Sequence, residues 1–200
     1  MTVEVEVKFL HIKHEEIRYK LKDNGFACVV PMRLMRRAII DYPDRRLQTG
    51  VPSSYIRVRD EGDKVTLTYK SFASLSISGA GEVEVVTSSF SDSVQIFEAV
   101  GLEVVSLQES RRETWRRGSC EIVLDEWPWL DPYIEIEGGT ESEVREVSNE
   151  LGLDWSTAKF GDVMVAYRDQ YPHLKEADTI GMIPEVLFSS PPPDFLRREG

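Results

Sequence analysis

Charged residues recur at every second position in several short segments of the chain. The segments are Glu4-Val-Glu6-Val-Lys8, Arg57-Val-Arg59, Thr66-Leu-Thr68-Tyr-Lys70, Glu82-Val-Glu84 and Glu135-Ile-Glu137. A spacing of two places side chains on the same face of a β-strand. Carboxylates and cationic groups gathered in this way could hold a phosphate chain together with hard metal ions, as phosphoryl chemistry requires.

The basic residues of this set suit a small anion. Lys8, Arg57, Arg59, Lys70 and Arg112 could cradle phosphate oxygens, the arginines as forked donors and the lysines as point charges. The chain as a whole has a net charge of -11, so these basic groups are local concentrations in an acidic protein. We therefore expect neither nucleic acid nor an anionic membrane as a partner, because both require a broad basic surface.

The acidic residues of the set suit a hard divalent cation. Glu4, Glu6, Asp125, Glu135 and Glu137 all offer oxygen ligands, which favour Mg²⁺ or Mn²⁺. The three histidines, His11, His14 and His173, lie outside the charged segments. A zinc site is therefore not expected.

A sheet with one solvated face gives the same alternation without any function. The elements around the charged segments are mostly strands, predicted at residues 3–9, 38–41, 55–59, 65–70, 81–86, 111–116, 120–124 and 133–137. Helices are predicted at residues 14–24, at 91–100 with Ser91 as N-cap, after the N-cap Thr140, and after Asp162. Eight strands could form a sandwich, an open sheet or a barrel. Converging charges on so many strands favour a polar interior.

The order of these motifs resembles the CYTH family of triphosphate tunnel metalloenzymes. The resemblance runs from residue 1 to about residue 170 and includes Arg112-Glu-Thr-Trp115 and Leu124-Asp125. It implies an α+β fold, in which a closed eight-stranded antiparallel β-barrel with flanking helices forms a tunnel and the charged faces point inward. We expect residues 1–170 to form this tunnel domain and residues 171–200 to form a tail that contains Pro191 to Pro193.

The resemblance also assigns roles to the charged residues. Glu4, Glu6, Glu135 and Glu137 would hold the metal ions with help from Asp125, and Glu82 and Glu84 would be further tunnel acids. Arg37 would add a phosphate contact. The expected catalytic group is Glu4, Glu6, Lys8 and Asp125, with either a carboxylate or a metal-bound hydroxide activating water. One departure is Ser110, which stands where relatives commonly carry a lysine, so one phosphate-binding charge is missing.

Hydrolysis of inorganic triphosphate or of an organic triphosphate is the predicted function. The alternatives are an adenylate cyclase of the class IV type, a thiamine triphosphatase, and a non-catalytic sensor of polyphosphate or nucleotide. The class IV cyclases share a His-Phe element near the start, and its absence here favours hydrolysis. The expected substrate is thus inorganic triphosphate, ATP or thiamine triphosphate.

Composition and the remaining residues limit the other functions. No run of about 18 apolar residues is present, so a cytoplasmic protein is expected. Cys28 and Cys120 have no metal-ligand spacing and are predicted to be core thiols.

Trp127 and Trp129 are predicted to pack inside the protein, although they are the best candidates for recognition of a nucleotide base. The tail is expected to pack on its own barrel or on a second copy of the chain in a homodimer.

Overall fold

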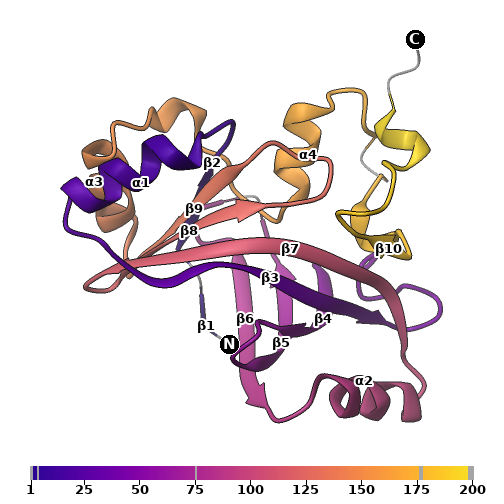
Figure 1. The fold of residues 1–200 in the computed structure, drawn as a ribbon. Coiled ribbons are helices and arrows are strands. Elements are labelled where there is room, and N and C mark those ends of the chain that lie inside the picture. Colours follow the sequence, from indigo (N-terminus) through magenta and orange to yellow (C-terminus); the bar gives the residue numbers. More distant parts are fainter. Residues whose placement is uncertain (1, 4, 75, 176–177, 198–200) are drawn as a thin grey trace.

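The computed structural model describes residues 2–3, 5–74, 76–175 and 178–197, so Glu4 lies outside the described residues. The strands are β1 Thr2–Val3, β2 Glu6–Phe9, β3 Ala27–Asp41, β4 Ser53–Asp60, β5 Val65–Phe72, β6 Ala80–Thr87, β7 Glu103–Arg117, β8 Cys120–Glu126, β9 Tyr133–Glu137 and β10 Glu185–Val186. The α-helices are α1 His14–Asp23, α2 Phe90–Ala99, α3 Glu141–Glu150 and α4 Met164–Gln170, and three short 3₁₀ helices are η1 Trp155–Thr157, η2 Ile180–Met182 and η3 Asp194–Leu196 (Figure 1). None of the described helices is long and apolar enough to cross a membrane.

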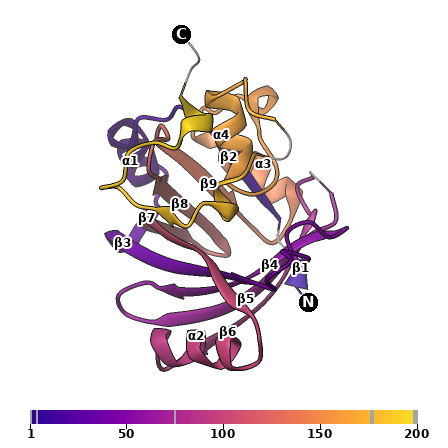
Figure 2. The same cartoon turned by 90° about the vertical axis from the view of Figure 1, so that its right-hand side faces the viewer.

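The strands form one curled sheet in the order β1-β6-β5-β4-β3-β7-β8-β9-β2 (Figure 2). The two ends of this order, β1 and β2, belong to the same N-terminal segment. Contacts reach across the curl: the amide of Glu6 donates to the carbonyl of Ile77 at 3.0 Å, and Lys70 on β5 pairs with Glu6 on β2 at 3.6 Å. The predicted α+β fold with eight antiparallel strands of four residues or more is therefore confirmed. The strand pairing leaves the curled sheet open, so the predicted closure into a barrel is not confirmed.

The apolar face of the curled sheet packs outward against helices. Val7 and Ile136 point away from the charged residues beside them in sequence and are fully buried. They form one cluster with Leu21 of α1 and Val147 of α3. This arrangement follows from the strand period of two, since apolar and charged residues that alternate must lie on opposite faces.

The helix predictions are largely confirmed. The hydroxyl of Thr140 accepts a hydrogen bond from the amide of Glu143 and caps α3 as predicted, and Gly25 ends α1 with a φ of +75°. The N-cap of α2 is Ser89, not the predicted Ser91, because the hydroxyl of Ser89 accepts from the amide of Asp92. Ser91 lies in the first turn of that helix.

Strands β3 and β7 are much longer than predicted. Each has 15 residues, and they pair along most of their length. The pairing contains register shifts between Cys28 and Val30, between Val30 and Arg33, and between Ile39 and Ile40. Each shift changes which residues face the interior, so a strict alternation does not run through the strand.

A buried carboxylate organises the connection from β3 to β4. Asp41 is fully buried, and its two oxygens accept hydrogen bonds from the amides of Tyr42, Leu47 and Gln48 at 2.7 to 3.1 Å. Three amide donors are thus satisfied by one side chain inside the fold.

We predict that Asp41→Ala lowers the free energy of unfolding by about 3 kcal/mol, because hydrogen bonds to a charged group are lost and buried donors are left without acceptors. Chemical denaturation measures the change. Asp44→Ala is the matched control, since Asp44 is exposed in the same loop and contacts the amide of Arg46 at 3.3 Å. Equal stability for the two variants would contradict the role given to Asp41.

A histidine links the end of β2 to α4. The ring of His11 contacts Asp169 of α4 at 3.0 Å and Asp131 of the β8–β9 connection at 3.3 Å. The hydrogen bond to Asp169, and after it that to Asp131, raise the pKa of His11 above its ordinary value of 6.5, although burial acts in the opposite direction. A raised pKa means that the stabilisation is complete below about pH 6.5 and is lost as the pH rises through the folded-state pKa.

We therefore predict that His11→Ala destabilises the protein more at about pH 5.5 than at about pH 9, by less than about 1 kcal/mol because the pair is partly exposed. Denaturation at both pH values gives the difference. His173→Ala is the control, since the ring of His173 contacts the carbonyl oxygen of Phe195. A pH-independent effect of His11→Ala would rule out the charged link.

Candidate active site

The strand register places most of the predicted charged residues on one face of the sheet. Residues directly opposite each other in a ladder share a face. The opposing pairs are Lys8 with Glu135, Arg112 with Asp125, Arg37 with Arg59, Arg57 with Thr68, Thr68 with Glu84, and Lys70 with Glu82. Because Lys70 also reaches Glu6 across the curl, this is the inner face of the curled sheet.

Two lysines bind the acids on one side of the interior. Lys8, with 2% of its surface exposed, lies 3.5 Å from Glu6 and 3.3 Å from Glu135. Lys70 lies 3.6 Å from Glu6 and 3.9 Å from Glu82. Burial alone would lower the pKa of Lys8, but Glu135 and Glu6 raise it above 10.5, so the ammonium group stays charged.

A second ion-pair cluster surrounds Arg112. Its guanidinium donates to both carboxylate oxygens of Asp125, which is fully buried, and lies 3.2 Å from Glu135. Burial alone would raise the pKa of Glu135, but Lys8 and then Arg112 lower it to about 2. Glu135 is therefore ionised at any pH at which the protein is expected to work.

Three arginines form the cationic side of the interior. Arg57 donates to the hydroxyl of Thr68 at 3.1 Å and lies 3.5 Å from Glu84. Arg59 pairs with Glu61 at 2.6 Å and lies 3.8 Å from Glu84. All three residues, Arg37, Arg57 and Arg59, are buried.

Arg37 differs from the other two in its partners. Its Nη2 donates to the hydroxyl of Ser110, and its guanidinium lies 4.4 Å from the ring centroid of Trp127. Among the described residues, no carboxylate oxygen forms an ion pair with its guanidinium nitrogens at 4.0 Å or less. A buried cation held only by a neutral hydroxyl and an aromatic ring is poorly compensated.

Burial and mutual repulsion act strongly on these arginines. Burial, followed by Arg57, lowers the pKa of Arg37 to about 9 and that of Arg59 to about 10. Both groups remain cationic at neutral pH. The Nε atoms of Arg37, Arg57 and Arg59 are buried and have no hydrogen-bond partner in the described part of the protein. An anion placed among them would satisfy the donors and offset the repulsion.

The predicted metal ligands that the structure describes are not gathered into one cluster. Glu4 lies outside the described residues, and Glu137 is exposed, opposite Glu6 in the ladder between β2 and β9. Within the described ranges, no three acidic, histidine or cysteine side chains converge on a common metal position. Their oxygen chemistry still fits a hard divalent cation, but Asp125 and Glu135 are here paired with Arg112.

Two interior residues were missed by the sequence analysis. Glu61 is 4% exposed and joins Arg59 to Arg33, which it contacts at 2.8 Å. Its position, two residues after Arg59, continues the period of the strand, and this signal could have identified it. Arg33 precedes Arg37 by four residues on the same face of β3, but the register shifts nearby obscure the pattern.

Trp127 packs inside the protein, as predicted. Trp127 is 6% exposed and belongs to an apolar cluster with Tyr133 and Tyr167. The indole of Trp129 donates to the carbonyl of Ser190 at 2.9 Å. Both rings are therefore engaged with the protein itself.

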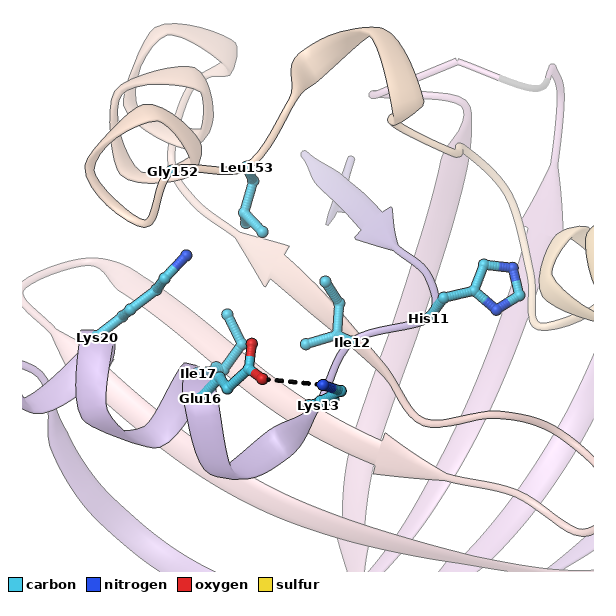
Figure 3. A pocket seen from close by; sticks show the side chains of 8 residues that line it. All are labelled: His11, Ile12, Lys13, Glu16, Ile17, Lys20, Gly152 and Leu153. Atoms are coloured by element: carbon cyan, nitrogen blue, oxygen red, sulfur yellow. Dashed lines mark ion pairs between the residues drawn. The ribbon is translucent and has the colours of Figure 1, made fainter.

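A pocket of about 230 Å³ lies outside the sheet, between α1 and the residues after α3 (Figure 3). Its polar groups are already partnered: Lys20 donates to the carbonyl of Leu151 at 2.7 Å, and Lys13 pairs with Glu16 at 3.2 Å. The sheet interior, with its unpartnered buried donors, is thus the better candidate for an anion site.

Comparison with solved structures shows the same fold in several proteins. A putative adenylate cyclase from Vibrio parahaemolyticus matches with a TM-score of 0.71 at 14% identity, covering 82% of this chain and 97% of that one. A Pyrococcus horikoshii protein matches with a TM-score of 0.67 at 18% identity, covering 82% and 98%. A putative adenylyl cyclase from Hippeastrum, described as having a dominant triphosphatase activity, matches with a TM-score of 0.55 at 16% identity, covering 84% and 96%.

A search of curated proteins gives no match. The CYTH domain matches residues 2–158, which is most of the chain and includes the charged strands of the interior. The family resemblance inferred from the motifs is therefore confirmed, and the chain belongs to the CYTH domain family.

Proposed function

We propose that the sheet interior binds a triphosphate and that the protein hydrolyses it with the help of a divalent cation. The observation that carries this proposal is the group of buried arginine Nε donors without partners on Arg37, Arg57 and Arg59. A phosphate chain supplies closely spaced anionic oxygens that match forked guanidinium donors. The triphosphatase activity described for the Hippeastrum relative supports the same reaction class.

In this proposal the curled sheet acts as a closed barrel, in which the N-terminal segment joins the first and last strands. The phosphate-binding residues would be Lys8, Arg37, Arg57, Arg59, Lys70 and Arg112. The metal ligands would be Glu4, Glu6, Asp125, Glu135 and Glu137, with Glu82 and Glu84 as further acids. A bound Mg²⁺ or Mn²⁺ would neutralise phosphate charge and acidify a water molecule.

The charge state of Glu135 favours a ligand role over a proton-transfer role. A general base works best when its pKa is near the operating pH. The pKa of Glu135, at about 2, is far below that range because Lys8 and Arg112 stabilise the carboxylate. Glu135 would therefore hold charge in the site, whereas another carboxylate would accept the proton of the attacking water.

Arg37 would supply the charge that Ser110 lacks. The family resemblance implies a lysine at the position of Ser110, and here the guanidinium of Arg37 donates to the serine hydroxyl. Arg37 would thus bind the phosphate that the missing lysine would otherwise contact.

A parallel assay tests the function. The protein is incubated with Mg²⁺ or Mn²⁺ and with inorganic triphosphate, ATP or thiamine triphosphate, and free phosphate and cyclic AMP are followed together. We expect phosphate release that EDTA abolishes. Cyclic AMP with pyrophosphate would instead identify a cyclase, the activity suggested by the Vibrio relative, and binding without turnover would identify a sensor.

We predict that Arg37→Gln raises the KM for inorganic triphosphate by about tenfold to 100-fold, because a charge-assisted hydrogen bond is lost. Arg36→Gln is the matched control, since Arg36 is 70% exposed on the opposite face and lies 3.6 Å from Glu109. Its KM should stay within about twofold of the wild type. If Arg36→Gln and Arg37→Gln have equal effects, the interior is not the phosphate site.

A further inference from the structure

Strand β6 is covered along only part of its outer edge. It pairs with β5 over its whole length, from residue 80 to residue 87, without a register shift. On its other side, β1 covers only Gly81 and Glu82. Among the described residues, no further strand pairs with residues 83–87 on that side, and Figure 1 shows β6 running past β1 toward α2. Residues 83–87 therefore present a free strand edge.

Other edges of the sheet are protected. Beside β2, Lys8 and Lys159 exchange two backbone hydrogen bonds at 2.9 and 3.0 Å. On β3, residues 27–35 pair with β7 on one side only, but this stretch contains Pro31 and register shifts, which both hinder the addition of a strand. The free edge of β6 has no proline, lysine or arginine and no register shift. It therefore lacks the features that usually prevent strand addition.

The free edge is apolar on its outer face. Val83 and Val85 are 48% and 52% exposed, and Tyr69, which lies opposite Val83 on β5, is 36% exposed. Leu67 lies opposite Val85, and Val58 lies opposite Leu67 on β4. An apolar row thus starts in the buried cluster that contains Val58 and reaches the free edge. A contiguous exposed apolar surface of this kind marks an interaction site.

The edge is complementary to a second copy of itself. A two-fold axis through Val85 gives an antiparallel strand pair in which Val85 faces Val85 of the second copy. The apolar row then continues across the axis through Val85 and Leu67 of both copies. On the inner face, Glu84 comes opposite Val86 of the second copy. An axis through Glu84 would instead place two carboxylates directly opposite each other, which is unfavourable.

Space and charge at this edge are compatible with a second copy. A hollow of about 330 Å³ lies between residues 86–88 and the β4–β5 turn, and Val86 is 70% exposed beside it. Glu84 is the only charged residue among residues 83–87, so the net charge of -11 is not concentrated at the edge. Repulsion between two copies therefore acts over longer distances and is screened by salt.

We propose that the free edge of β6 binds a second copy of the chain and forms a two-fold homodimer with a continuous sheet across Val85. Addition of a strand at an exposed edge supplies main-chain hydrogen bonds, and the facing valines add apolar contact. The edge is short compared with the interfaces of permanent dimers, so we expect a Kd of about 10 to 100 μM. This pairing is independent of what the sheet interior binds.

Sedimentation of the full chain at about 0.3 M salt, from about 5 to 500 μM protein, tests the association. The mass should rise from 22.9 kDa toward twice that value. Val85→Lys places two like charges opposite each other at the axis and should weaken association at least tenfold. Ile96→Lys is the matched control, since Ile96 is an apolar residue of α2 that is 65% exposed, and it should associate like the wild type.

Cysteine cross-linking tests the register. In a Cys28→Ser background, Val85→Cys brings two thiols together at the axis, and the remaining Cys120 is 2% exposed. Val83→Cys leaves its two thiols about 13 Å apart along the strands, which is beyond the reach of a disulfide. With oxidised glutathione, Val85→Cys should form a covalent dimer at least tenfold faster than Val83→Cys.

Three results would overturn the inference. The first is a mass that stays at 22.9 kDa up to about 500 μM protein. The second is a dimer that Val85→Lys leaves intact, because another surface would then hold the copies together. The third is equally fast cross-linking of Val83→Cys and Val85→Cys. If Val85→Lys does not fold, Val83→Lys takes its place in the sedimentation experiment.

Discussion

Burial of several arginines inside the curled sheet is the constraint on which the rest of the structure depends. Charged groups removed from water are costly unless opposite charges and hydrogen bonds compensate them. Glu61, Glu84 and Asp125 compensate part of the positive charge, yet the Nε donors of Arg37, Arg57 and Arg59 stay unpartnered among the described residues. These unpartnered donors are the basis for proposing that the interior binds an anion.

The outer parts of the fold follow from this interior. Strands that turn charged residues inward must turn apolar residues outward, and α1 and α3 cover those residues on one side. On another side, α4 and the C-terminal segment pack on Trp127 and Tyr133, and Trp127 lies against the guanidinium of Arg37. The helices therefore complete the core and also exclude water from the surroundings of the charged groups. Electrostatic interactions are stronger where water is excluded.

Much of the interior could be predicted from sequence because its signal is local. Lys8, Arg57 and Glu135 each stand in an alternating segment, so their shared face follows from the strand period. The full lengths of β3 and β7 could not be predicted, because the shifts in their register break the alternation. The C-terminal segment packs on the sheet of its own chain, which is one of the two predicted arrangements. Where it packs could not be predicted, since this depends on contacts between residues far apart in sequence, such as Ile180 with Gln108. Whether the predicted metal ligands act together, and whether the boundary at residue 170 separates two units, stay predictions.

The most direct test of the account is a crystal structure of the protein with inorganic triphosphate and a divalent cation. Phosphate oxygens are expected within hydrogen-bond distance of the Nε atoms of Arg37, Arg57 and Arg59, and the cation is expected between the phosphate chain and the carboxylates. A triphosphate bound on the outer surface, for example at Lys13 and Lys20, with the interior arginines still unpartnered, would contradict it.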